Sequence, residues 1–217
     1  MKNTKRTFAP AVGLLTAFVL WTAAVCMIDV QPIGPLESEV GFAALNGFVH
    51  RLTGVHLSLY ILTDWLSIIP LGIVAGFGLL GLRQWVRRKD LRRVDGSILA
   101  LGGFYLVVMA LFLFFEQAVV NYRPILIEGV LEASYPSSTT MLVMCVIPTA
   151  MLQLSARIKS RPLRLCALTA LALFLVFMVA GRLISGVHWF TDIVGGALLS
   201  AGLVALYRGV TQVLNSR

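Results

Sequence analysis

The chain has 217 residues, of which 58% are hydrophobic and only 13% are charged, and its mean hydropathy is +0.87. Soluble domains are about 45–50% apolar and ~25% charged, so this composition excludes a soluble globular protein. Because each transmembrane helix needs about 20 mostly apolar residues, the length allows roughly five to seven membrane spans and leaves no room for a separate soluble domain.

Six apolar segments follow one another along the chain, and each is close to the length that crosses the hydrocarbon core of a bilayer. They occupy residues 8–28, 57–82, 96–115, 138–154, 165–181 and 189–207. The first follows basic residues as a signal peptide would, but it exceeds the usual apolar stretch of about 7–15 residues and no small-residue cleavage site follows it. We therefore predict an all-α integral membrane protein, with residues 1–217 forming a single domain of six transmembrane helices.

The positive charges predict the orientation in the membrane. Of the 18 Lys and Arg residues, 15 lie in segments 1–7, 83–95, 155–164 and 208–217, which share one side of a six-span topology. Cytoplasmic loops of membrane proteins carry such an excess of Lys and Arg. We therefore predict that both termini are cytoplasmic, and we expect the membrane to be a bacterial plasma membrane.

The net charge of +8 could also indicate a nucleic-acid partner. Its densest cluster, residues 83–93, lies on the predicted cytoplasmic side, where it is interpreted as a topology determinant in contact with anionic membrane lipids. No nucleic-acid partner is therefore predicted. The cysteines Cys26, Cys145 and Cys166 match neither a disulfide framework nor a metal-binding spacing and are interpreted as small hydrophobic residues.

Polar residues gather in three groups at the predicted outer ends of the spans. These are Asn121-Tyr122-Arg123-Pro124, the segment from Ser134 to Thr140, and Gly181-Arg182 with His188 and Asp192. An Arg beside a Pro is commonly an interfacial residue at a helix boundary. Pro136-Ser137-Ser138 is an ordinary helix start, in which a Ser caps free backbone amides that also attract anions. Capping and anion binding are compatible, so this motif alone does not distinguish a structural helix start from an anion-binding site.

His188 and Asp192 are more informative because their i, i+4 spacing puts them on one helix face. A carboxylate in that position holds one imidazole N–H and leaves the other ring nitrogen free, as a nucleophilic or basic histidine requires. An interfacial His paired with a capping Asp is an equally good interpretation of the pair by itself.

The combination favours a phosphate site. Two arginines, a serine-rich helix start and a His–Asp pair are all predicted on one face of the membrane, and arginine forks bind phosphate oxygens bidentately. The set therefore predicts a phosphate pocket with a nucleophile.

At these residues, over 116–192, the sequence resembles the type 2 phosphatidic acid phosphatase superfamily. The members of that superfamily carry Lys-x6-Arg-Pro, then Pro-Ser-Gly/Ser-His, then Ser-Arg-x5-His-x3-Asp, and the order of the motifs matches here. The resemblance implies that His188 attacks phosphorus to form a phosphohistidine and that Asp192 orients it.

The same resemblance implies the phosphate-binding residues. Arg123 and Arg182 are expected to clamp the phosphate, with Ser137 and the backbone of Ser138 as an anion cradle. The resemblance implies no metal ion and no organic cofactor.

Three positions depart from the family pattern. Glu116 stands in place of Lys, Gly181 in place of Ser, and Thr139 in place of the His that protonates the leaving group. A carboxylate beside a phosphate repels it unless it is protonated or paired, so we expect Glu116 to hold Arg123 or Arg182 in place. Thr139 cannot act as a general acid at neutral pH, a role commonly contributing about 10²–10⁴-fold to the rate.

Other polar residues are given lesser roles. Tyr135, Glu128 and Glu132 lie in the same outer loop and are alternative sources of the missing proton, although loop carboxylates are more often solvated. His50, His56 and Asp64 are expected to be interfacial or helix-capping residues rather than catalytic ones.

We therefore predict a lipid phosphate or diphosphate phosphatase with its site at the outer membrane face, whose substrate is a phosphorylated lipid with its tail between helices. Two alternatives keep the pocket. One is a protein that binds or carries lipid phosphates without turning them over, and the other is a phosphotransferase that passes the phosphoryl group from His188 to a second acceptor.

Overall fold

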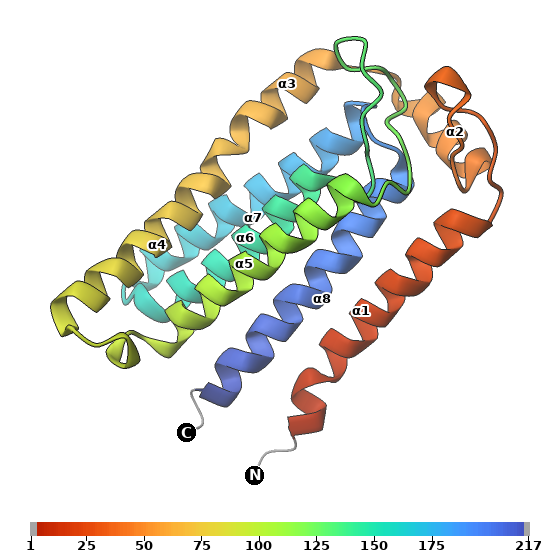
Figure 1. Ribbon diagram of the computed structural model, residues 1–217. Coiled ribbons are helices and arrows are strands. Elements are labelled where there is room, and N and C mark those ends of the chain that lie inside the picture. Colours follow the sequence, from red (N-terminus) through yellow and green to blue (C-terminus); the bar gives the residue numbers. More distant parts are fainter. Residues whose placement is uncertain (1–3, 215–217) are drawn as a thin grey trace.

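The structure is a computed structural model that describes residues 4–214. Over this range the chain forms α-helices and two short 3₁₀ turns and contains no β-strand, which confirms the predicted all-α class (Figure 1). The elements are α1 (Thr4–Met27), η1 (Pro35–Glu37), α2 (Ala43–Thr53), α3 (Leu57–Leu66), α4 (Ile68–Arg88), η2 (Leu91–Arg93), α5 (Gly96–Gln117), α6 (Ser138–Arg157), α7 (Arg161–Ile184) and α8 (Phe190–Leu214).

Six helical segments of the described chain are long and apolar enough to cross a membrane, as predicted. They are Arg6–Met27, Leu57–Arg88, Gly96–Gln117, Ser138–Arg157, Arg161–Ile184 and Phe190–Leu214. The second is a pair of helices, α3 and α4, that meet at Ser67. The spans extend beyond the apolar runs because helix ends with basic side chains can sit at the interface, where the charged group reaches water.

Helix α2 is not predicted from the sequence, which assigns residues 29–56 to a connection. It begins after Phe42, whose backbone is left-handed with a φ of 49°, and it contains polar residues among its apolar ones. Its position is fixed by tertiary contacts, because buried Asn46 accepts from the Thr191 N–H at 3.1 Å and donates to the Thr191 hydroxyl at 2.9 Å. A short helix of this kind is stabilised by packing rather than by its own sequence.

Helices α6 and α8 form the centre of the bundle, with α1 packed along α8 and α7 along α6. The core between them contains Phe18, Leu101, Met141 and Leu203 among other buried side chains. On α8, a β-carbon added at Gly202 would lie 2.8 Å from the Leu15 side chain, so glycine allows α1 to approach closely. Small residues serve this purpose in membrane helix pairs generally.

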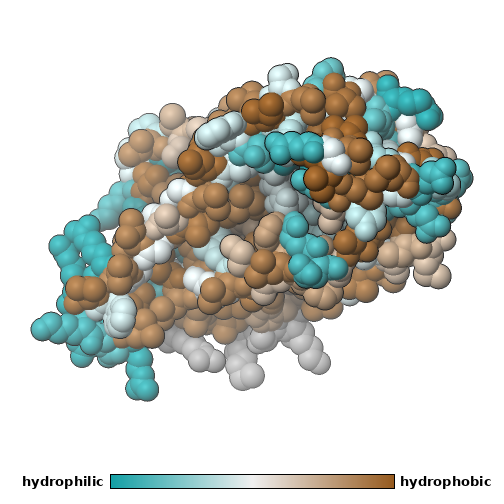
Figure 2. Space-filling model, turned by 45° about the horizontal axis from the view of Figure 1, so that its top comes forward, coloured by the Kyte–Doolittle hydropathy of each residue, from teal (hydrophilic) through white to brown (hydrophobic). Residues whose placement is uncertain are grey.

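The flank of the molecule is largely apolar, whereas hydrophilic residues gather at its two ends (Figure 2). Many large apolar side chains are exposed on the outer helices, including Leu79 on α4, Leu106 on α5 and Leu173 on α7. In a membrane protein this surface faces lipid, so its exposure is expected.

The two ends of the bundle differ in what they carry. The start of α1, the end of α8 and the α4–α5 connection lie at one end (Figure 1). The 118–137 connection, α2 and the α7–α8 turn lie at the other. Which end faces the cytoplasm stays a prediction, and the basic terminal residues Lys2 and Arg217 lie outside the described residues.

Candidate active site

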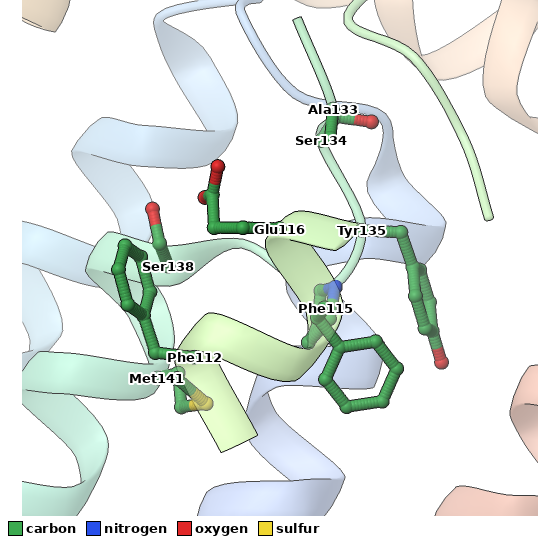
Figure 3. A pocket seen from close by; sticks show the side chains of 9 residues that line it. Phe112, Phe115, Glu116, Ala133, Ser134, Tyr135, Ser138 and Met141 are labelled. Atoms are coloured by element: carbon green, nitrogen blue, oxygen red, sulfur yellow. The ribbon is translucent and has the colours of Figure 1, made fainter. Parts of the chain in front are cut away.

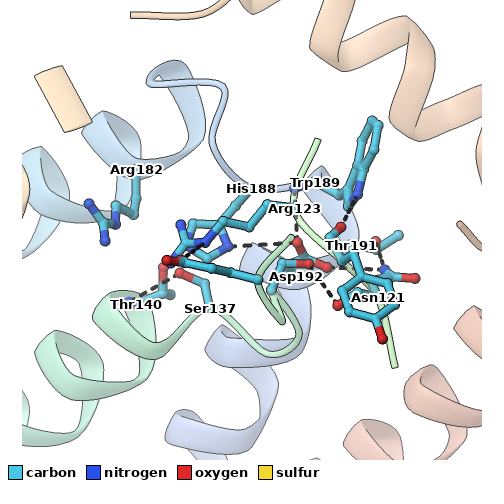
Figure 4. A network of polar contacts seen from close by, with 12 residues as sticks. Asn121, Arg123, Ser137, Thr140, Arg182, His188, Trp189, Thr191 and Asp192 are labelled. Carbon is cyan, nitrogen blue, oxygen red and sulfur yellow. Dashed lines mark hydrogen bonds and ion pairs between the residues drawn. The ribbon is translucent and has the colours of Figure 1, made fainter. Parts of the chain in front are cut away.

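Three segments bring the predicted site residues together at one end of the bundle (Figure 4). The 118–137 connection supplies Arg123, the start of α6 supplies Ser137, and the α7–α8 region supplies Arg182, His188 and Asp192. All five are buried, with His188 only 3% exposed. The Ser137 N–H donates to the carbonyl of Asp192 at 3.1 Å, which ties the second motif to the third.

Asp192 is held in the first turn of α8 by two donors. The Asn121 side-chain amide donates to Oδ1 at 3.1 Å, and the Trp189 N–H donates to Oδ2 at 2.9 Å. Oδ2 also faces Nδ1 of His188 at 3.7 Å, an ion-pair distance that is longer than a hydrogen bond. The carboxylate therefore has a fixed position from which it can orient the imidazole.

The imidazole of His188 presents Nε2 to Arg123, whose Nη1 lies 3.4 Å away. A guanidinium only donates, so Nε2 must be the acceptor that carries the lone pair, and the ring proton is assigned to Nδ1 on the Asp192 side. Burial, together with the positive charges of Arg123 and Arg182, lowers the pKa of His188 to about 4, and Asp192 opposes this only in part. His188 is therefore neutral at pH 7.

Arg123 is held by Glu132 from the same connection. The Arg123 backbone N–H donates to the Glu132 carbonyl at 3.0 Å, and Nε of the side chain lies 2.9 Å from Glu132 Oε2. Glu132, one of the alternative proton sources considered from the sequence, is therefore the ion-pair partner of Arg123, because the isolated β-bridge between Tyr122 and Ala133 turns this loop back on itself and aligns the two side chains.

Arg182, near the end of α7, is held by α3. Its nearest carboxylate is Asp64, with Oδ1 3.4 Å from Nη2. The ring of Tyr60 lies beneath both arginines, with its centroid 4.7 Å from Cζ of Arg182 and 5.8 Å from Cζ of Arg123. Asp64 thus supports Arg182 in addition to the interfacial or capping position expected from the sequence, and Tyr60 carries no signal in the sequence that marks it.

The start of α6 forms an anion-binding geometry beside these side chains. The Ser137 hydroxyl caps the helix and accepts from the Thr140 N–H at 3.4 Å. Among the described residues, the amides of Ser138 and Thr139 have no hydrogen-bond acceptor, and the helix dipole adds a partial positive charge there. This end of α6 can therefore donate to phosphate oxygens.

Thr139 faces a cavity of about 280 Å³ between α4, α5 and α6. Asp64 and Ser138 line its polar end, and the rest is mostly apolar. A second apolar cavity of about 490 Å³ continues between α4 and α5 and shares Val74 and Met109 with the first. Thr139 therefore lies where the start of α6 meets an apolar groove.

Two expected supporting residues lie elsewhere. Glu116 is exposed at the end of α5 beside a small crevice that Ser138 also lines (Figure 3), and it pairs with no arginine in the described chain. The prediction that it holds Arg123 or Arg182 is wrong, because Glu132 and Asp64 occupy those roles. Tyr135 points its hydroxyl at Thr22 on α1, 2.7 Å away, and burial raises its pKa well above the usual range, so it does not supply a proton to the site.

The α7–α8 turn is supported by the segment around α2. His50 Nε2 donates to the Gly186 carbonyl at 3.1 Å, and the His56 N–H donates to the Ser185 carbonyl at 2.9 Å. Gly186 has a φ of +68°, and a β-carbon there would lie 2.0 Å from the Gly54 carbonyl oxygen. The side chain of His50 and the backbone of His56 therefore support the turn that positions His188.

Comparison with known proteins shows the family and the fold of the chain. A family model described as the PAP2 superfamily matches residues 103–215, slightly more than half of the chain. No curated protein matches the chain. One similar solved structure is a crystal structure described as the first transmembrane PAP2 type phosphatidylglycerolphosphate phosphatase from Bacillus subtilis. It has a TM-score of 0.58 and 20% identity, over 94% of this chain and 97% of that one, which shows a shared fold.

Proposed function

Because the chain belongs to the PAP2 superfamily, we propose that it is a membrane phosphatase of phosphorylated lipids with His188 as its nucleophile and an arginine clamp for the phosphate. The observation that carries the proposal is the orientation of His188. Its Nε2 lone pair faces Arg123 at 3.4 Å, while Nδ1 faces the anchored Asp192 at 3.7 Å. A phosphate held by the arginine thus meets the free ring nitrogen.

In the first step, the Nε2 lone pair of His188 attacks phosphorus, and a P–N bond forms as the P–O bond to the lipid breaks. The ring becomes cationic, and Asp192 stabilises that charge. Arg123 and Arg182, with the amides at the start of α6, stabilise the charge on the phosphoryl oxygens. The leaving oxygen takes the electron pair and needs a proton in proportion to its basicity.

In the second step, a water oxygen attacks phosphorus and the P–N bond breaks. The electron pair returns to Nε2, the proton of the attacking water passes to solvent, and inorganic phosphate is released. With Nε2 free again, the site is ready for a second turnover.

The apolar groove supports a lipid substrate. Its upper end meets the site at Ser138 and Thr139, and the groove runs between α4 and α5 along the lipid-facing flank. A lipid tail in this groove would place its phosphate at the start of α6, with the leaving oxygen near Thr139.

With Thr139 in place of a general acid, lipid diphosphates should be hydrolysed faster than lipid monophosphates. An alkoxide that leaves a monophosphate needs a proton from a general acid, which threonine cannot provide. From a diphosphate the leaving group is the lipid monophosphate, which departs as a stable anion because the second ionisation of a phosphate monoester has a pKa of about 6. We also place the site at the outer face of a bacterial plasma membrane, on the strength of the basic residues at the opposite end.

The test is phosphate release by purified protein from a panel of lipid mono- and diphosphates, with ³²P-labelled substrate to trap an acid-labile, alkali-stable phosphohistidine. We expect release and a labelled wild-type protein, and neither in His188→Ala. A wild-type protein that binds vanadate but releases no phosphate would instead be a lipid-phosphate binding protein. Phosphate appearing only on an added acceptor would identify a phosphotransferase.

A further inference from the structure

The guanidinium of Arg182 is held by α3, which packs against α7. Nη1 donates to the Tyr60 carbonyl and to the Thr63 hydroxyl, both at 3.2 Å, and Nη2 donates to Asp64 Oδ1 at 3.4 Å. These residues lie outside the segment 103–215 that carries the family motifs. Comparison of motifs therefore assigns them no role.

Thr63 occupies the space that a side chain at position 181 would need. A β-carbon added at Gly181 would lie 2.9 Å from Thr63 Cγ2, so one of the two would have to move. The family motif has a serine at this position, and here the methyl group of Thr63 from the neighbouring helix lies against it while the Thr63 hydroxyl faces Arg182. The absence of a side chain at Gly181 therefore leaves the space that the Thr63 side chain fills.

The Thr63 hydroxyl can accept from Arg182 without competition. Thr63 is fully buried, and its Oγ1 lies 2.9 Å from the carbonyls of Leu59 and Tyr60 on its own helix. The single hydroxyl proton is directed at those carbonyls, so the lone pairs of Oγ1 remain for Nη1 of Arg182. The helix itself therefore fixes the direction from which this acceptor approaches the guanidinium.

The contacts with α3 leave some N–H donors of the Arg182 guanidinium without an acceptor among the described residues. Of its five N–H donors, α3 engages three, and Nε is buried with no hydrogen-bond partner among residues 4–214. Arg182 is only 2% exposed, so bulk water does not reach these donors. Free, desolvated donors of a held guanidinium suit a phosphate.

We propose that Thr63 is a positioning residue for phosphate binding, whose hydroxyl replaces the serine hydroxyl absent at Gly181 and turns the free donors of Arg182 toward the phosphate. The inference rests on the proposed function, because it concerns how that same site holds its phosphate. Asp64 holds Arg182 less firmly than Thr63 does, since the Asp64 side chain is 61% exposed and its Oδ1 lies 3.4 Å from Nη2 of Arg182.

The experiment measures the affinity of detergent-purified protein for orthovanadate and inorganic phosphate by calorimetry, together with the melting temperature. Thr63→Val keeps the shape and removes the hydroxyl, and it should weaken binding by about tenfold, as expected for a hydrogen bond to a charged group. Thr63→Ser keeps the hydroxyl and should stay within about twofold of wild type. Thr149→Val is the matched control, because Thr149 is also buried and bonds to carbonyls of its own helix, at 2.7 and 3.0 Å, far from the site.

The reciprocal exchange gives a second arm that does not depend on Thr63→Val folding well. Gly181→Ser alone should weaken binding because its β-carbon meets Thr63. In a Thr63→Ala background, Gly181→Ser should strengthen binding, because the space is free and the hydroxyl returns from the other side. The same substitution is therefore expected to act with opposite sign in the two backgrounds.

Three results would overturn the proposal: wild-type affinity in Thr63→Val, an equal loss of affinity in Thr149→Val, or the same effect of Gly181→Ser in both backgrounds. Failure of the proposed function is recognised separately, by wild-type protein that binds phosphate and shows the Thr63 effect but turns over no lipid phosphate. A wild-type protein that binds neither phosphate nor vanadate would end both.

Discussion

The two ends of the bundle both combine arginines with carboxylates, yet they differ in burial. At the basic end, the Arg88–Asp95 pair spans 3.1 Å with side chains 44% and 39% exposed, and Arg93–Asp90 spans 3.7 Å with still greater exposure. At the site end, Arg182 is almost fully buried. Exposed pairs are screened by water and contribute little to stability. A buried arginine lacks that screening and depends on the acceptors placed around it, so similar residues are solvated at one end and held in fixed positions at the other.

The largest expected difference between the two ends is the side of the membrane from which each can be labelled. In a background with Cys26 and Cys166 replaced by Ser, single cysteines at Glu128 and Leu36, both exposed at the site end, should react with an impermeant thiol reagent added outside intact cells. A cysteine at Arg92, at the basic end, should react only after permeabilisation. The opposite pattern would place the site on the cytoplasmic side.

Loss of the nucleophile should come next. His188→Ala should lower kcat by at least about 10³-fold, because no other group can form the P–N bond, while vanadate binding persists through the arginines. Arg88→Ala at the basic end is the control and should leave the rate within about twofold. A His188→Ala protein with an unchanged rate would end the phosphohistidine mechanism.

Restoring an acid should change substrate preference. Thr139→His should raise kcat/KM for a lipid monophosphate by about 10- to 100-fold and for a diphosphate much less, because only the alkoxide leaving group needs the proton. The cavity of about 280 Å³ beside Thr139 gives the imidazole room. An equal gain on both substrates, or a wild-type preference for monophosphates, would show that the proton comes from another group.

The pH dependence tests the burial of His188 directly. A nucleophile with a pKa near 6.5 is mostly protonated at pH 5.5, whereas one with a pKa of about 4 is still neutral. The acidic side of the pH profile, where His188 becomes protonated, should therefore fall only as the pH drops through about 4. At pH 5.5 the enzyme should retain about tenfold more activity than one whose nucleophile is an exposed histidine. The check is the kcat/KM profile, with melting temperature followed to exclude acid unfolding. A fall centred near 6.5 would contradict the burial argument.

The carboxylate that supports Arg123 should give the smallest effect. Glu132→Gln should weaken phosphate binding about three- to tenfold, because it removes the 2.9 Å ion pair that holds Arg123, and the effect stays modest because the Glu132 side chain is 40% exposed. Glu116→Gln is the matched control and should change affinity by less than about twofold, since that carboxylate pairs with neither arginine. The reverse ranking would restore Glu116 as the supporting residue.

Several parts of the site could be predicted because they depend on short segments. Asp192 lies in the first turn of α8, whereas His188 precedes the helix, so the expectation that both share one helix face is wrong, although their short separation still brings the two side chains together. Ser137, Arg182, His188 and Asp192 lie at or beside span ends, where hydropathy and spacing predict them, whereas Arg123 lies within the 118–137 connection. The partners of the arginines were not predictable in this way. Glu132 reaches Arg123 only because the 118–137 connection folds back, and Asp64 reaches Arg182 from a helix 118 residues earlier in the chain.

By itself the sequence determined the number of spans, because a bilayer imposes a fixed length of apolar chain, and it indicated the family, because the motifs carry particular residue types in a fixed order. Only the tertiary structure decided the break between α3 and α4, the presence of α2 and the packing of Thr63 against Gly181. These features depend on distances between segments far apart in the chain. Such distances are set by how the helices pack, and packing is a property of the whole bundle rather than of any local pattern.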